Sequence, residues 1–367
     1  MGAIVEIFRN FGPEYMTLYP DMPLQHKKTI EAIINCRSGS YGVAVYQCDN
    51  CGTKHLIDRS CGNRHCPQCQ YQKSRQWLEA QLNKRLPGAH FLLTFTLPEQ
   101  LRLFCRDHQE AAYGAMFRAS AGAIKKLAKD PRFIGADLPG FTAVLHTWGR
   151  QIQYHPHLHF ICPAGGLSPD RTKWLPAHNT FYLPVKALSK IFRAKFRDEM
   201  AKRGLLHKID ASCWQIAWNI NCQPIGDSEA TLKYLAPYIF RVAISDSRIV
   251  AVKDRMVTFS YQKKGSNRNR KTTLDVIEFI RRFLQHVLPA GLMKVRHYGF
   301  MSSNCTVSIT RLRLLILTSL KISGLSLTDL STIKPKPALP KPICPTCGGI
   351  LLYLFSLIPG RPCRGPT

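Results

Sequence analysis

The sequence predicts an α+β fold, because strand-like and helix-like stretches alternate along most of its 367 residues. Two local patterns refine this expectation. The first is a His-Leu-His triplet at residues 157–159, inside the strand-like stretch 141–166. The second is a pair of Cys-x2-Cys motifs within residues 46–69, which predicts a small zinc-ribbon-like module ahead of the main domain.

Hydrophobic spacing assigns the elements in outline. Apolar residues at helical spacing, or a basic amphipathic pattern, predict helices at residues 1–40, 70–86, 98–128, 187–204 and 274–288. Runs rich in β-branched and aromatic residues predict strands at residues 90–97, 141–164, 213–221 and 248–262.

The His-Leu-His triplet has the geometry of a metal clamp. On a strand, His157 and His159 project from one face and Leu158 from the other. Pro156 cannot donate a ladder hydrogen bond, so we expect this strand to lie at a sheet edge or to start late. An ordinary pair of strand histidines is the alternative, and a second feature of the chain argues against it.

That second feature is a pair of tyrosines. Tyr234 and Tyr238 are four residues apart, which places both phenols on one face of a helix. Residues 227–229, Asp-Ser-Glu, have the chemistry of a helix start, and Pro237 predicts a kink or an end near there. A metal held by histidines can polarise a phosphodiester, and a tyrosine oxygen can then attack the phosphorus. The alternative to two nucleophiles is that one of the tyrosines only packs against its neighbours.

The clustered cysteines predict a structural zinc site. Cys48 with Cys51, and Cys66 with Cys69, each form a knuckle that offers two thiolates, and four thiolates close a tetrahedral zinc. Cys61 and His65 lie between the pairs and are rival ligands. Reduced, buried cysteines are the alternative, but so short a segment has few apolar groups with which to build a core.

The charge balance points to a polyanionic partner. The chain has 51 Lys and Arg against 23 Asp and Glu, a net charge of +28. Such an excess favours contacts with phosphate groups, and a generic basic protein is the alternative. The candidate contacts flank the tyrosine pair and are Arg241, Lys263, Lys264, Arg268, Arg270 and Lys271.

We expect a cytoplasmic protein. Glu6 and Arg9 interrupt what would be the apolar part of a signal peptide, and no apolar run reaches the ~18 residues that span a bilayer. In a reducing compartment, clustered cysteines indicate metal binding rather than disulfides. The sequence does not predict an oligomeric state.

The composition divides the chain into three consecutive parts. These are N-terminal helices with the zinc-binding module, 1–89, a main domain, 90–303, and a basic, Pro-rich tail, 304–367. The tail contains a Pro/Lys linker and then Cys344 and Cys347, a knuckle with no obvious partner nearby. We interpret this knuckle as an inert remnant or part of a disordered tail, with zinc binding as the less favoured alternative.

The sequence resembles that of a known family over roughly residues 5 to 303. His-hydrophobic-His on a strand, followed by two tyrosines on one helical face, resembles the HUH endonucleases, and in detail the two-tyrosine HUH rolling-circle transposases of bacterial insertion sequences. The segments that carry the resemblance are EIFRNFGPEYM at 6–16, SCGNRHCPQCQ at 60–70, FLLTFTLPEQL at 91–101, LHTWGRQIQYHPHLH at 145–159, YLAPYIFRVAIS at 234–245 and EFIRRFLQHVLPAGLMKVRHYGF at 278–300.

The resemblance implies a fold, a chemistry and a site. The fold is the HUH core, an antiparallel sheet with flanking helices, behind an N-terminal zinc-binding transposase domain. The implied activity nicks and joins single-stranded DNA, at the element ends and at the target, through a covalent 5′-phosphotyrosine. Tyr234 and Tyr238 are the implied nucleophiles, and His157 and His159 the implied ligands of catalytic Mg²⁺ or Mn²⁺ beside the structural Zn²⁺.

HUH sites usually take a third polar ligand, for which we favour Gln151, with Gln153 and His155 as rivals. The resemblance places the protein in the bacterial cytoplasm, at the nucleoid. A replication-initiator or relaxase-type nickase is the nearest alternative. A non-catalytic zinc-finger DNA-binding regulator is the alternative from outside the enzymes.

Overall fold

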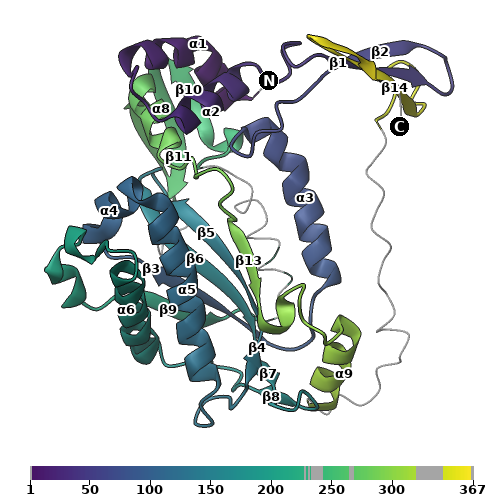
Figure 1. Ribbon diagram of the computed structural model, residues 1–367. Helices are drawn as coiled ribbons and strands as arrows, with labels where there is room; N and C mark the ends of the chain where they lie inside the picture. The colour runs from purple at the N-terminus through teal and green to yellow at the C-terminus, as the bar shows by residue number, and fades with distance from the viewer. Residues whose placement is uncertain are drawn as a thin grey trace. The chain divides into compact units, whose positions relative to one another are not determined.

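The computed structural model describes residues 2–226, 229, 232, 243–263, 268–319 and 342–364. The chain divides into two compact units that interleave along the sequence (Figure 1). The terminal unit comprises residues 1–76, 240–287 and 334–367, and the central unit comprises residues 77–239 and 288–333. The sequence predicted three consecutive domains with boundaries near residues 89 and 303. In the structure, by contrast, each unit is built from segments that are separated in the sequence.

The central unit is built on a five-stranded antiparallel sheet. Its order is β13 (Val295–Tyr298), β5 (Phe141–Trp148), β6 (Tyr154–Pro163), β3 (His90–Thr96) and β9 (Ile220–Pro224). Strands β5 and β6 form a hairpin. With the helices around it, this sheet confirms the predicted α+β class and the antiparallel HUH-type core.

The strand that carries the His-Leu-His triplet is not at an edge. β6 pairs with β3 on one side and with β5 on the other, so the expected edge position is wrong. Pro156 is accommodated because the ladder to β3 begins only at His157 and the ladder to β5 shifts register between His146 and Trp148. The alternative expectation was that the strand starts late. It holds for the pairing with β3, which begins at His157 although β6 begins at Tyr154.

One face of this sheet carries the core. α5 (Gln109–Ala128) and α6 (Val185–Ala201) pack against each other and against the sheet (Figure 1). Leu188, Phe192, Phe196 and Met200, spaced four residues apart, form the buried stripe of α6. The sheet contributes the alternate residues of its strands to the same core: Phe91, Leu93, Phe95, Phe141, Leu145, Leu158 and Phe160. The residues between them, including the histidines, therefore face the other side.

Smaller elements complete the central unit. β4 (Leu138–Pro139), β7 (Gly165–Leu167) and β8 (Trp174–Pro176) form a second antiparallel sheet, and α9 (Ile309–Ser319) packs on it through Leu312 and Ile316. The remaining short helices of this unit are η1 (Glu99–Leu101), α4 (Arg102–Asp107), η2 (Leu206–Lys208), η3 (Ala211–Trp214) and η5 (Gly299–Met301).

The helical part of the terminal unit joins distant segments. α1 (Ala3–Leu18) packs with α2 (Leu24–Ile34) and with α8 (Val276–Leu284), and Phe8 meets Phe283 edge to face at 5.0 Å. The backbone amide of Ile4 at the start of α1 donates to Asp246, which lies in the short helix η4 (Asp246–Arg248). A three-stranded antiparallel sheet completes this part: β10 (Ile249–Lys253), β11 (Met256–Gln262) and β12 (Asn269–Asp275).

A four-stranded sheet joins two ends of the chain. Its order is β15 (Arg361–Arg364), β14 (Leu351–Ile358), β1 (Val43–Cys48) and β2 (Lys54–Asp58), all antiparallel. Residues 351–358 of the expected tail thus lie beside residues 43–48 (Figure 1). α3 (Pro67–Asn83) follows β2 and continues from the terminal into the central unit. Among the described helices, none is both long and apolar enough to cross a bilayer.

Candidate metal centres and catalytic site

Three imidazoles converge on the face of the central sheet opposite α5 and α6. His157 and His159 project from β6, and His146 projects from β5 directly opposite His157. The ligand atoms of the three rings all lie within 4.8 Å of one another. The clustering follows from strand geometry, because cross-strand partners and residues two apart share a face.

Hydrogen bonds orient two of these rings. His157 Nδ1 lies 2.7 Å from the carbonyl oxygen of His155, which can only accept, so Nδ1 carries the proton and Nε2 keeps its lone pair. His159 Nδ1 lies 3.1 Å from the Thr94 hydroxyl, which can accept in the same way. Partners of this kind fix the tautomer and the orientation of metal-ligating histidines.

Burial keeps the three imidazoles neutral. Desolvation lowers the pKa of His146 and of His157 well below the ordinary value, and it lowers the pKa of His159 to about 4. The neutral ring is the form that binds a metal ion. The centre is therefore ready to accept a cation near neutral pH without first losing protons.

The third imidazole differs from the residue favoured by sequence. Gln151 lies in the turn between β5 and β6, where its backbone amide donates to the Gln153 side chain at 2.9 Å. The Arg102 guanidinium donates to His155 Nδ1 at 3.2 Å. The residue that the structure brings to the His157–His159 pair is His146. The sequence feature that could have identified His146 is the β5–β6 hairpin, because its register places His146 directly opposite His157.

The two tyrosines, with Arg241 and Lys264, lie outside the described residues. Two residues just before Tyr234 are described. Glu229 forms an ion pair with Arg85, and Leu232 is buried in a small pocket whose lining includes Thr142 and Ile161. Thr142 and Ile161 are cross-strand partners, and each shares a sheet face with the histidines of its strand.

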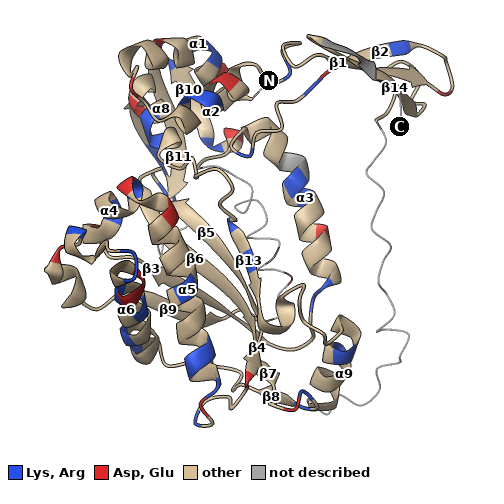
Figure 2. Cartoon of the chain, in the orientation of Figure 1, with Lys and Arg blue, Asp and Glu red and all other residues tan. Residues whose placement is uncertain are grey.

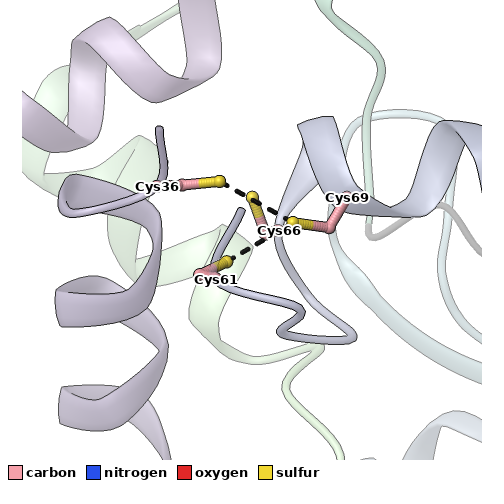
Figure 3. Close-up of side chains that lie close together, drawn as sticks. All are labelled: Cys36, Cys61, Cys66 and Cys69. Carbon is pink, nitrogen blue, oxygen red and sulfur yellow. Dashed lines mark hydrogen bonds between the residues drawn. The ribbon is translucent and has the colours of Figure 1, made fainter. Parts of the chain in front are cut away.

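The structure separates the cysteine pairs that the sequence analysis had grouped into one zinc site. Cys66 and Cys69 meet Cys36 and Cys61, with sulfur–sulfur distances of 3.7 Å (Cys36–Cys69) and 3.5 Å (Cys61–Cys69) (Figure 3). We call this set the N-terminal cysteine cluster. Cys48 and Cys51 instead meet Cys344 and Cys347.

The reason for the separation is the β1–β2 hairpin. Cys48 and Cys51 sit at its closed end, whereas Cys36 and Cys61 flank its open end, where the Arg59 amide donates to the Gly42 carbonyl at 3.0 Å. The six-residue strand β1 is roughly 20 Å long, too far for one ion to reach both ends. Cys36, which sequence spacing did not single out, completes the cluster because α2 ends beside it. His65 is not part of either cluster.

Four of the predicted DNA contacts lie on one hairpin. Lys263 directly follows β11, Arg268 directly precedes β12, and Arg270 and Lys271 lie at the start of β12, all four exposed. Elsewhere Lys and Arg are spread over α3, α5, α6, α9 and β13 rather than gathered on one element (Figure 2).

Comparison with known proteins finds similarity to transposases over most of the chain. A family model described as "Putative transposase" matches residues 140–308, and one described as "Transposase zinc-binding domain" matches residues 7–97. The chain is similar to "Putative transposase y4qJ" of Sinorhizobium fredii, 36% identical over 320 residues, which cover 82% of this chain and 80% of the relative. It is also similar to "Transposase for insertion sequence element IS801" of Pseudomonas savastanoi, 26% identical over 298 residues, covering 75% and 70%. No solved structure matches.

The antiparallel sheet, the cysteine-rich module and both matches together define a transposase. The chain belongs to the two-tyrosine HUH rolling-circle transposase family of bacterial insertion sequences, and it carries the zinc-binding domain typical of such transposases at its N-terminal side.

Proposed function

We propose that this transposase nicks and joins single-stranded DNA through a covalent 5′-phosphotyrosine, the chemistry of rolling-circle transposition. The observation that carries the proposal is the set of three neutral imidazoles, one buried and two half-buried, on one face of the central sheet. Its partners are single strands at the element ends and at the target, on the bacterial nucleoid.

The donor set fits a divalent cation. His146, His157 and His159 would hold it through three imidazole nitrogens and leave further positions open to a phosphate oxygen or water. Once bound, the cation would supply Lewis-acid stabilisation of the charge that develops on the phosphodiester. Because imidazole is a softer ligand than carboxylate or water, this set favours Mn²⁺ over Mg²⁺.

The proposed strand transfer conserves the phosphodiester bond energy. The phenolic oxygen of Tyr234 or Tyr238 attacks the phosphorus, a tyrosine–phosphate ester forms, and the bond to the 3′ oxygen breaks. The phenolic proton is lost and the departing 3′ oxygen gains one, which releases a 3′ hydroxyl. Attack by a 3′ hydroxyl on the phosphotyrosine reverses these steps and joins two strands. The positions of Glu229 and Leu232 support a tyrosine segment near the histidine face.

We also propose that the N-terminal cysteine cluster holds one structural zinc ion. Four thiolates close the coordination sphere and leave no position for substrate. The ion would join the end of α2 to the start of α3. The hairpin residues Lys263, Lys264, Arg268, Arg270 and Lys271, with Arg241, are the proposed contacts to the DNA backbone.

The test is a cleavage assay on single-stranded oligonucleotides that tile the element ends, with Mn²⁺ or Mg²⁺. We expect a protein–DNA adduct that survives denaturation, and mass spectrometry of its tryptic peptides should place the 5′ phosphate on residue 234 or 238. A DNA-binding regulator would bind these strands and leave them uncut. An adduct on another residue, or cleavage that leaves both ends free, would contradict the mechanism.

A further inference from the structure

Four cysteines from distant parts of the terminal unit meet at the closed end of the β1–β2 hairpin. Cys48 Sγ lies 3.4 Å from Cys347 Sγ, and Cys51 Sγ lies 3.8 Å from Cys344 Sγ. All four sulfur atoms lie within 4.8 Å of one another. Two of them lie outside residues 7–97, the part of the chain that the zinc-binding domain model matches.

The two pairs are held by the same backbone turn. Each is a Cys-x2-Cys-Gly sequence whose glycine has a left-handed backbone, with φ of 70° at Gly52 and 75° at Gly348. The Gly52 amide donates to the Cys48 carbonyl at 3.1 Å, and the Gly348 amide donates to the Cys344 carbonyl at 2.9 Å. Such a repeated turn presents two sulfur atoms from each segment toward a common centre.

The surroundings of the sulfur atoms suit thiolates. The backbone amides of Asn50 and Cys51 point at Cys48 Sγ, at 3.4 and 3.5 Å. His55 Nε2 lies 3.3 Å from Cys344 Sγ and can donate to it. Hydrogen-bond donors around the sulfur are the second shell expected of a metal-bound cysteine.

The two turns are also locked to each other. The Asp49 amide donates to the Ile350 carbonyl at 3.0 Å, and the Ile350 amide donates to the Asp49 carboxylate at 2.8 Å. A Cβ atom at Gly349 would lie 2.8 Å from Cys48 Sγ, so the approach of the two segments requires glycine there. The β1–β14 ladder begins at once, with Cys48 opposite Leu351.

Packing alone is a weak account of this junction. The buried cluster around it consists of Cys48, Cys344 and Leu351, with Tyr46 against it. Leu352, Tyr353 and Leu357 of β14 are 47%, 42% and 41% exposed, so three large apolar side chains of that strand contribute only part of their surface to a core. A small module with so little buried apolar area usually needs a metal or a disulfide. One disulfide would use only two of the four sulfur atoms, and two disulfides would need only two separate pairs, whereas all four sulfur atoms here lie within 4.8 Å of one another, as the ligands of one ion do.

We propose that Cys48, Cys51, Cys344 and Cys347 bind a second structural zinc ion, which fastens residues 342–364 to the N-terminal hairpin. Four thiolates in a tetrahedral arrangement are a donor set for Zn²⁺ or another soft divalent cation. The zinc ribbon of this protein is therefore assembled from two knuckles that lie almost three hundred residues apart. This inference does not depend on the nicking chemistry.

The first test is metal content. Full-length protein purified without chelators should lose one zinc per chain when C344S and C347S are combined, and none in the matched control C305S, whose cysteine lies in the central unit outside both clusters. A combined C36S and C66S variant should also lose one zinc per chain, in this case the ion proposed for the N-terminal cysteine cluster. An unchanged zinc content in the C344S and C347S variant would overturn the proposal.

The second test uses the unmodified chain, so it does not depend on a variant folding. Brief alkylation followed by peptide mass spectrometry should leave Cys344 and Cys347 unlabelled until a chelator is added, although Cys347 is exposed. Hydrogen exchange of residues 351–358 should rise on the same addition. Labelling of both cysteines before the chelator, or recovery of Cys48 and Cys347 as a disulfide, would contradict a zinc site.

Discussion

At the scale of single residues, the three histidines differ in what orients them. A backbone carbonyl orients His157, and a threonine hydroxyl orients His159. His146 stacks on Trp148 with ring centroids 5.1 Å apart. The support of His159 is a hydrogen-bond partner on another side chain, which a substitution can remove, so ligand and support can be tested separately.

The His146→Ala variant tests the proposed metal ligand that sequence reasoning missed. We expect the cleavage rate to fall at least about 100-fold, with DNA binding largely retained, because the substitution removes a proposed metal ligand and none of the proposed phosphate contacts. The same loss is expected for His157→Ala and His159→Ala. The control is His178→Ala, an exposed histidine of the same unit. Cleavage by His146→Ala at the rate of the unmodified protein would exclude His146 from the centre.

The Thr94→Val variant tests the support of His159. Valine keeps the shape of threonine and removes the hydroxyl that pairs with His159 Nδ1. We expect roughly 10- to 100-fold weaker Mn²⁺ affinity, the usual cost of losing such a partner. Titration of cleavage with Mn²⁺, together with calorimetry, measures it. Thr96→Val is the matched control, because Thr96 lies on the same strand face opposite His157. Equal effects of the two substitutions would remove any special role from Thr94.

At the scale of elements, local patterns were predictable and pairings between elements were not. Period-two alternation is local, so it placed His157 and His159 on one face correctly. The partnership of His146 with His157 depends on the register of the β5–β6 hairpin, which follows from the turn geometry rather than from residue spacing. The edge position inferred from Pro156 failed for the same reason, because a register shift beside the proline removes the need for its missing N–H.

The cysteines repeat this lesson. Each Cys-x2-Cys knuckle was recognisable, because its turn is set by five consecutive residues. The pairing of the knuckles was not predictable. Cys66 and Cys69 are nearer in sequence but lie a strand length away from Cys48 and Cys51, whereas the pairing of β14 with β1 brings Cys344 and Cys347 beside them. The N-terminal zinc-binding domain is confirmed, while the partner of Cys48 and Cys51 differs from the predicted one.

The β11–β12 hairpin carries a prediction about salt. Combining K263Q, R268Q, R270Q and K271Q should flatten the dependence of single-strand affinity on salt, by about 0.7 log units per lost phosphate contact for each tenfold change in salt. Fluorescence anisotropy over a range of NaCl concentrations measures this slope. The control removes four exposed charges on or next to α6: K186Q, K190Q, R197Q and K202Q. If the control flattened the slope as much, binding would reflect net charge rather than the hairpin.

At the scale of the whole molecule, the proposed reaction requires the protein to handle two DNA ends. One nucleophile is enough for a single nick, whereas two allow one tyrosine to hold the first end while the other cuts the next junction. The three-histidine centre lies in the central unit, and both cysteine clusters lie in the terminal unit. The proposed chemistry and the proposed zinc sites are thus in different units and can be altered independently.

The tyrosine relay can be tested with single and double substitutions. We expect Tyr234→Phe and Tyr238→Phe each to retain one nicking activity and each to lose strand transfer, because the second end then has no nucleophile. The double variant should form no adduct. Gel assays that score nicking and joining on the same substrate separate the two steps. Strand transfer by Tyr238→Phe at the unmodified rate would show that the protein works with one tyrosine.

The pairing of β1 with β14 has a consequence for the order of events on the ribosome. Cys51 emerges 293 residues before Cys344, an interval of roughly 15 to 60 s at ordinary rates of synthesis. During that interval β1 lacks its neighbouring strand β14, and the thiols of Cys48 and Cys51 lack Cys344 and Cys347. The N-terminal cysteine cluster, by contrast, is complete once residue 69 has been made. Nascent chains should therefore acquire the two proposed zinc ions at well-separated times, the second only after Cys347 has been made.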